Sequence, residues 1–206
     1  MRTKLERMVG PLERLGIRDA GQIVILGGIG RVWFPHGSLD LANFRHLGVS
    51  HKDAFEIERV EFPSGGLLVV ENLTPFEACI DQIAASQQLM VLWSAGFPGR
   101  GVRLVIGKAA ESNVRIRMWC DLDLGGIRIA RTILRTAPAA EPVLMDPAAL
   151  KLTTNRRPLA PDQLAAIRRD LTIHPAEPLA DTLKALAAAN VWVEQETLID
   201  SIGSAF

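Results

Sequence analysis

Three carboxylates stand directly after two apolar runs of the chain, where their types and spacing could serve metal chemistry. One run, residues 66–70, leads into Glu71, and another, residues 116–120, leads into Asp121 and Asp123. Short apolar runs are typical of buried parallel strands, and ligands of an open α/β sheet collect beyond the carboxyl ends of such strands. We therefore expect these three acids to converge at one edge of a sheet.

The spacing of the two aspartates favours a shared ligand. Side chains alternate along an extended segment, so Asp121 and Asp123 should point the same way while Leu122 points into the protein. That arrangement suits a hard cation. Two glycines, Gly125 and Gly126, then allow a sharp turn before the next helix.

A purely structural explanation of the same residues stays open. Acids at strand ends often cap the following helix, because a side-chain oxygen accepts a hydrogen bond from a free backbone N–H. Glu71, Asp121 and Asp123 could each be such a cap.

The composition excludes several other chemistries for this chain. Its 206 residues include no tyrosine, which excludes topoisomerase-type transesterification by this polypeptide alone. Cys79 and Cys120 lie in apolar stretches and the four histidines are scattered, so we expect no zinc site. The formal net charge is zero, with 23 basic and 23 acidic residues, so any contact with DNA needs a local basic patch.

The hydropathy of the chain indicates a globular protein. Hydrophobic residues make up 48% of the sequence and charged residues 22%. No apolar stretch approaches the ~20 residues that cross a bilayer, and the N-terminal residues lack the apolar core of a signal peptide. We expect a cytoplasmic protein without membrane contact.

Strands and helices alternate from residue 66 onward, as in a parallel sheet with crossover helices. The pattern predicts strands over residues 66–70, 90–93, 114–120 and 143–145, and helices over residues 74–88, 103–110, 127–136, 161–170 and 177–189. Before residue 66 it predicts helices over residues 1–15 and 39–47 and strands over residues 22–26, 31–34 and 54–62. The predicted fold class is α/β, a central mostly parallel sheet flanked by helices. We expect a small N-terminal extension, residues 1–65, packed on a domain of residues 66–206 that ends in a helical segment.

Arginines flank the second acidic run. Arg100 and Arg103 precede it, whereas Arg128, Arg131 and Arg135 follow it on the predicted helix, where spacings of three and four put them on one face. They could bind DNA phosphates. They could equally form an ordinary solvated helix face.

The order of these motifs resembles the Toprim module of topoisomerases, primases and related nucleases. Five segments carry a closer resemblance: Val69-Val70-Glu71-Asn72, Gly96-Phe97-Pro98, Trp119-Cys120-Asp121-Leu122-Asp123 with Gly126, Met145-Asp146, and Glu194-Gln195-Glu196. Together they resemble the C-terminal Toprim-like domain of JetD, the nuclease subunit of Wadjet plasmid-defence systems, over residues 35–200. Cys120 departs from the family pattern, where a glycine is usual before the first aspartate.

The resemblance implies a metal-dependent DNA endonuclease that acts within an SMC-like complex for defence against plasmids or phage. Asp121 and Asp123 would bind Mg²⁺ or Mn²⁺, which phosphodiester hydrolysis uses to neutralise the phosphate and activate water. Glu71 would be a third ligand or the general base, because crowded carboxylates raise a pKa. Glu196 would be a second-metal ligand or support the site, although the Glu-Gln-Glu segment could also be a solvated strand. DNA, other subunits of the complex and a second copy of the chain are the implied partners.

Two other functions compete with this interpretation. One is a non-catalytic scaffold or dimerisation module that keeps the Toprim fold. The other is a phosphatase of the haloacid dehalogenase type, with Asp121 as nucleophile. That chemistry requires Thr or Val after the second aspartate and a downstream lysine, whereas Leu124 and Gly125 follow Asp123 here and only Lys151 and Lys184 come later.

Overall fold

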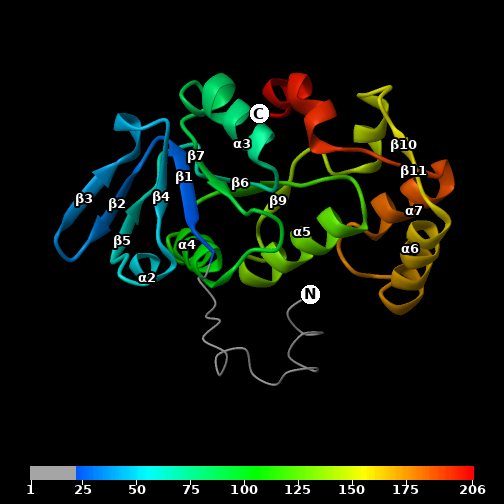
Figure 1. Ribbon diagram of the computed structural model, residues 1–206, viewed down its shortest axis with the longest axis horizontal. Coiled ribbons are helices and arrows are strands. Elements are labelled where there is room, and N and C mark those ends of the chain that lie inside the picture. The colour runs from blue at the N-terminus through cyan, green and yellow to red at the C-terminus, as the bar shows by residue number, and fades with distance from the viewer. Residues whose placement is uncertain (1–21) are drawn as a thin grey trace, which may run out of the picture.

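The structure, a computed structural model, describes residues 22–206. A central sheet lies between helices above and below it, with a small sheet at one end of the molecule and a helical C-terminal region at the other (Figure 1). The helix predicted over residues 1–15 lies outside the described residues.

Six strands form the central sheet, in the order β4-β1-β7-β6-β8-β9. Their bounds are Val24–Gly28 (β1), His46–Val49 (β4), Leu67–Val70 (β6), Met90–Trp93 (β7), Ile116–Trp119 (β8) and Glu141–Pro142 (β9). Strands β7, β6, β8 and β9 run parallel, and β1 and β4 pair antiparallel at one side. Val70 is in register with both Trp93 and Trp119, so three parallel strands end at the same level.

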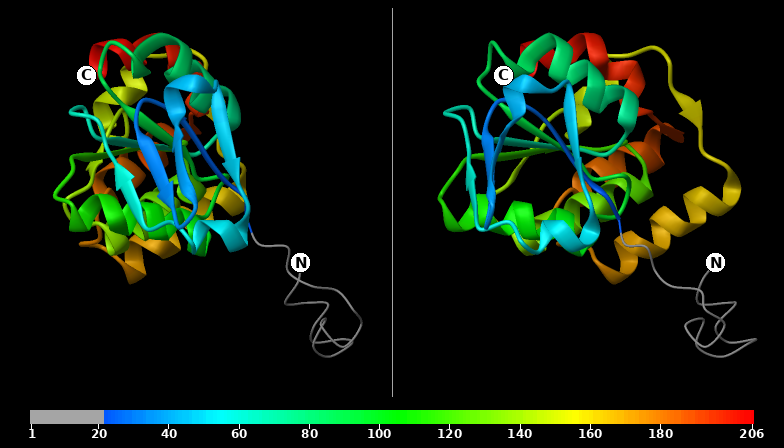
Figure 2. Two further views of the ribbon diagram at one scale, coloured as in Figure 1. Left: turned by 90° about the vertical axis from the view of Figure 1, so that its left-hand side faces the viewer. Right: turned by 60° about the vertical axis from the view of Figure 1, so that its left-hand side comes forward.

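The helices cover both faces of this sheet (Figures 1 and 2). On one face lie α3 (Leu73–Cys79), which continues into the π-helix η3 (Ile80–Ala84), and the C-terminal 3₁₀ segment η5 (Gln195–Ala205). On the other face lie α4 (Arg100–Glu111) and α5 (Leu124–Thr136). Helix α4 buries Val102, Val105, Ile106 and Ala109, whose spacing of three and four residues makes one apolar stripe.

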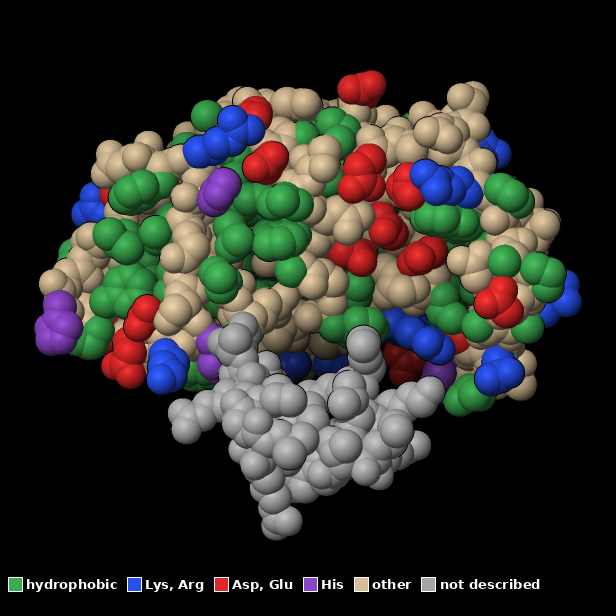
Figure 3. Space-filling view, in the orientation of Figure 1, with side chains coloured by type: hydrophobic (Ala, Val, Ile, Leu, Met, Phe, Trp, Pro, Cys, Tyr) green, Lys and Arg blue, Asp and Glu red, His purple; other side chains and the backbone are tan. Residues whose placement is uncertain are grey.

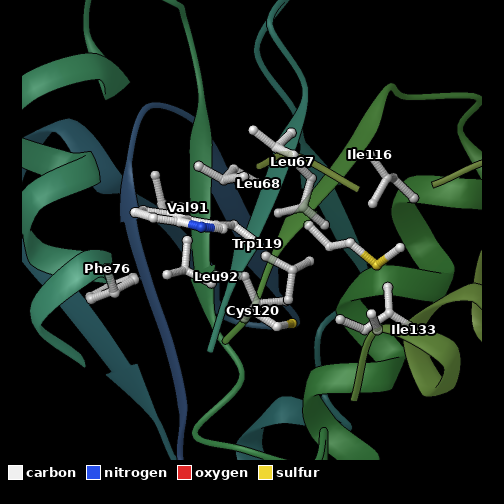
Figure 4. Packing of buried hydrophobic residues seen from close by; sticks show 14 of the residues in the cluster. Leu67, Leu68, Phe76, Val91, Leu92, Ile116, Trp119, Cys120 and Ile133 are labelled. Carbon is white, nitrogen blue, oxygen red and sulfur yellow. The ribbon is translucent and has the colours of Figure 1, made fainter. Parts of the chain in front are cut away.

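The core forms where these helices meet the central strands. All four residues of β6 are fully buried. A strand covered on both faces requires such an uninterrupted apolar run, because neither side faces water. Trp119 of β8 is the largest fully buried side chain, and Figure 4 shows it among the buried residues of the central strands.

A second, three-stranded antiparallel sheet contains β2 (Arg31–Phe34), β3 (Gly37–Asp40) and β5 (Arg59–Glu61), in the order β3-β2-β5. A 3₁₀ turn η2 (Leu41–Asn43) and a short helix α2 (His51–Ala54) lie between its strands. The helix predicted over residues 39–47 is therefore wrong. Leu47 pairs with Leu26 of β1, and only Leu41 is buried in the intervening turn, so sheet pairing outweighs the local pattern.

The C-terminal region contains η4 (Pro147–Lys151), α6 (Pro161–Ile173), α7 (Ala180–Ala189) and a two-stranded ribbon of β10 (Arg157–Pro158) and β11 (Val191–Trp192). After β11 the chain returns to the central sheet, where Val193 pairs antiparallel with Leu122. This return brings the last part of the chain beside the end of β8.

The predicted fold class is confirmed, since helices flank a central sheet whose strands are mostly parallel. The expected division after residue 65 does not follow an edge of that sheet, because β1 and β4 are two of its strands. Among residues 22–206, no helix is both long and apolar enough to cross a membrane.

Candidate functional site

The ends of β6 and β8 bring Glu71 and Asp121 into direct contact. The backbone N–H of Glu71 donates to the Trp119 carbonyl at 3.1 Å, which extends the strand pairing by one residue. In return Oε2 of Glu71 accepts a hydrogen bond from the Asp121 N–H at 3.1 Å. Acidic side chains gather near the centre of the face seen in Figure 3.

The Asp121 carboxylate accepts hydrogen bonds from two separate segments. Its Oδ1 accepts a hydrogen bond from Nδ2 of Asn72 at 3.0 Å and another from the backbone N–H of Gln195 at 2.7 Å. Asn72 precedes α3, yet its side chain makes no capping hydrogen bond there. The Asn72 amide therefore orients the carboxylate.

Asp123 begins α5. Its Oδ1 accepts the backbone N–H of Gly126 at 2.7 Å, so the capping role foreseen for such acids applies to this residue. A Cβ at position 126 would collide with the Asp121 backbone, which restricts this position to glycine. Leu122, between the two aspartates, is fully buried, as the alternation predicts.

Gln195 is the site residue whose role the sequence did not reveal. Besides its N–H bond to Asp121, its Oε1 accepts the Asn72 N–H at 3.0 Å and its Nε2 donates to the Trp119 carbonyl at 2.7 Å. The side chain is fully buried and connects the ends of β6 and β8 to the returning C-terminal segment. Alternation from buried Val193 could have indicated that Gln195 points inward.

Each of the three carboxylates uses one oxygen to hold the fold. Glu71 Oε1, Asp121 Oδ2 and Asp123 Oδ2 accept no hydrogen bond from residues 22–206. Within the same residues, no lysine or arginine forms an ion pair with these acids. Among residues 22–206, no group of three His, Cys, Asp or Glu side chains is arranged closely enough to hold one metal ion directly.

The carboxylates perturb one another. Burial, together with the charge of Asp121, raises the pKa of Glu71 from 4.5 to about 7, with smaller contributions from Asp123 and Glu196. Burial also raises the pKa of Asp121 to about 6, and the charges of Asp123 and Glu196 add to this against the hydrogen bonds from Gln195 and Asn72. Glu196, in the first turn of η5, therefore belongs to the same electrostatic cluster.

The four predicted DNA-binding arginines have different surroundings. Arg100 is exposed at the start of α4, and Arg103, also exposed, donates to the Pro98 carbonyl at 3.1 Å. Arg128 and Arg131 both pair with Asp170 of α6, at 3.0 Å and 2.6 Å. The Arg131 side chain is only 5% exposed, so it stabilises the packing of α5 on α6 instead of lying on an open helix face.

The comparisons with known proteins agree with the motif order. Residues 38–205 match the family described as Wadjet protein JetD, C-terminal. No curated protein matches the chain. The match covers most of the chain and includes every acid of the cluster, so the resemblance to JetD is confirmed, whereas the relation to Toprim modules stays a prediction. The chain belongs to the JetD C-terminal family and has its role in the Wadjet defence system.

Proposed function

We propose that this chain is the DNA-cleaving domain of a Wadjet complex, a metal-dependent endonuclease of the Toprim type. The observation that carries the proposal is the acidic cluster at the ends of β6 and β8. Its three carboxylates are each fixed through one oxygen, and the second oxygen is left for a ligand.

The donor set fits Mg²⁺ or Mn²⁺. Hard divalent cations prefer carboxylate oxygens, and Mg²⁺ usually keeps several waters while it binds only one or two carboxylates. A hydrated ion therefore needs no direct contact with three side chains at once. When bound, such an ion would neutralise charge on the phosphate and activate the attacking water.

The side chains of this site would divide the remaining work. Asp121 and Asp123 would hold the ion, with Asn72 and Gln195 fixing the orientation of Asp121. Glu71, whose pKa is about 7, can take up or release a proton near neutral pH. It would be either the general base or a third ligand, and Glu196 would bind a second ion or support the first.

Nicking of supercoiled plasmid tests the proposal. We expect the purified chain to cleave in Mn²⁺, and Asp121→Asn or Asp123→Asn to remove the activity, with Asp162→Asn as the matched control because Asp162 is exposed on α6. The assay is repeated with the other subunits of the complex, since those partners would position the DNA substrate. Cleavage that survives Asp121→Asn would refute the assignment.

The alternative, a non-catalytic scaffold or dimerisation module, makes a different prediction. For a scaffold, titration calorimetry would find no difference in Mn²⁺ binding between the wild-type chain and Asp121→Asn. A chain with the acidic cluster mutated would also still support plasmid defence in cells. Loss of plasmid defence in the Glu71→Ala strain, with the protein still folded, would count against the scaffold.

A further inference from the structure

A basic cleft of 240 Å³ lies between α5, the C-terminal end of α6 and the loop after β7. Three arginines line it from α5 and a phenylalanine from the loop; the lining residues are Phe97, Arg128, Arg131, Thr132, Arg135, Asp170, His174 and Glu177. Three guanidinium groups face two carboxylates there, which leaves the cleft positive.

Both oxygens of the Asp170 carboxylate, which lines the cleft, already accept hydrogen bonds from arginines. Asp170 accepts hydrogen bonds from Arg131 at 2.6 Å and from Arg128 at 3.0 Å and 3.2 Å. Although burial alone would raise it, these bonds lower the pKa of Asp170 below its ordinary value. One negative charge therefore serves two arginines, and the positive surplus remains available to a ligand.

Arg131 has a donor to spare. Its Nε donates to the Pro178 carbonyl at 2.9 Å and its Nη1 to Asp170, but its buried Nη2 has no hydrogen-bond partner among residues 22–206. A buried N–H group without a partner costs free energy, and a guanidinium group binds phosphate oxygens well. Arg131 therefore keeps a guanidinium charge that Asp170, shared with Arg128, balances only in part.

Phe97 adds a surface for a base. Its side chain is 58% exposed at the rim of a polar cleft, between Gly96 and Pro98. Exposed aromatic rings beside a basic groove are the platforms on which the bases of single strands stack.

The cleft lies within reach of the acidic cluster. Asp123 caps the N-terminus of helix α5, so Arg128 and Arg131 follow it by ~7.5 Å and ~12 Å along the helix axis at 1.5 Å per residue. Even at the compact spacing of B-DNA, about 3.4 Å of axis per phosphate, this separation is no more than roughly two to four nucleotides, and it is fewer in an extended unpaired strand.

We propose that this cleft binds a phosphodiester of the DNA strand a few nucleotides from the one cut at the acidic cluster, with the adjoining unpaired base stacked on Phe97. The inference rests on the proposed function, because it takes the cleaved strand as the ligand. It assigns the cleft to single-stranded or locally opened DNA.

Fluorescence anisotropy with a labelled single-stranded oligonucleotide, in EDTA so that no cleavage occurs, tests the inference. We expect Arg128→Ala/Arg135→Ala to weaken binding about ten-fold or more and to reduce the slope of log affinity against log salt by about two. Phe97→Ala should weaken binding of the single strand about ten-fold and of duplex much less. Arg168→Ala/Arg169→Ala is the matched control, because both are exposed on α6 outside the cleft.

Several outcomes would overturn the inference: no binding of the oligonucleotide by the wild-type chain, equal losses in both double variants, or competition by inorganic phosphate as strong as by unlabelled oligonucleotide. Thermal melting identifies a variant that does not fold. Arg135→Ala alone then carries the test, because among residues 22–206 its guanidinium group donates only to Thr132. A chain that binds through the cleft but never cleaves in Mn²⁺ would refute the proposed nuclease and leave this inference standing. A chain that cleaves normally as the Arg128→Ala/Arg135→Ala variant would refute this inference and leave the proposed nuclease standing.

Discussion

Replacing Glu71 by glutamine should stabilise the metal-free protein at neutral and alkaline pH. Burial and the charge of Asp121 raise the pKa of Glu71 from 4.5 to about 7, so the folded state binds this proton more tightly than the unfolded chain does. By linkage, stability then falls as the pH rises from about 4.5 through about 7, because the unfolded state binds fewer protons there. Glutamine cannot ionise, yet its side-chain oxygen can still accept the Asp121 N–H bond.

The size of the gain follows from the shift. At about 1.36 kcal/mol per pKa unit the ionised side chain costs up to about 3 kcal/mol, and solvent screening of this half-buried group reduces the figure to about 2 kcal/mol. For a chain of this length 1 kcal/mol changes Tm by about 2–4 °C, so Glu71→Gln should raise Tm by about 4–8 °C at about pH 8. At about pH 5 the difference should shrink below about 1 kcal/mol, since wild-type Glu71 is then protonated in the folded state.

Thermal melting in EDTA at both pH values measures this, with Glu56→Gln as a control on an exposed acid. Saturating Mn²⁺ should make the wild type more stable than the variant. At a free ion concentration about a hundredfold above Kd, binding adds about 2.7 kcal/mol to the stability of the wild type, and it adds less to the variant. A Glu71→Gln protein that is less stable than the wild type in EDTA at about pH 8, or equally shifted at both pH values, would refute the reasoning.

Three more outcomes follow from the structure. Gln195→Ala should lower Mn²⁺ affinity or cleavage about 10–100-fold, because it removes the side-chain hydrogen bonds to Asn72 and Trp119 that fix the segment whose backbone N–H orients Asp121; calorimetry and plasmid nicking measure this, and an unchanged Mn²⁺ affinity and rate would contradict it. Asp170→Ala should destabilise the fold by about 3–5 kcal/mol in urea titrations, because it leaves the buried Arg131 without its ion-pair partner. A loss below about 1 kcal/mol would be too small for a buried ion pair that holds α5 against α6. Cys79 and Cys120 should resist a thiol reagent in the native state, because both are buried and burial raises their pKa values; rapid labelling of either would contradict this.

The sequence predicts the acidic cluster because its logic is local. An apolar run that ends in an acid places that acid at the carboxyl end of a strand, and parallel strands bring such ends together. Glu71 and Asp121 meet in this way, 50 residues apart in the chain. The alternation that buries Leu122 is equally local.

The parts that the sequence could not predict depend on distant pairings. Gln195 reaches Asp121 across 74 residues only because the C-terminal segment returns to pair with Leu122. Helical spacing put Arg131 and Arg128 on one face, but spacing does not reveal that the face packs on α6, whose Asp170 lies 39 residues beyond Arg131. Helical periodicity states which residues share a face and leaves the partner of that face undetermined.

Two sets of acids in this chain have opposite surroundings, and the contrast bears on function. Asp170 is surrounded by two arginines that lower its pKa, which is how a structural carboxylate is neutralised within a fold. Glu71 and Asp121 have raised pKa values and no basic partner among residues 22–206, and their neighbours Asp123 and Glu196 add more negative charge. A cluster needed only for the fold would gain stability from a nearby lysine or arginine, or from apolar substitutes. Uncompensated charge at one point of a stable fold is typical of sites where stability is given up for function, and a divalent cation is the partner that would balance this one.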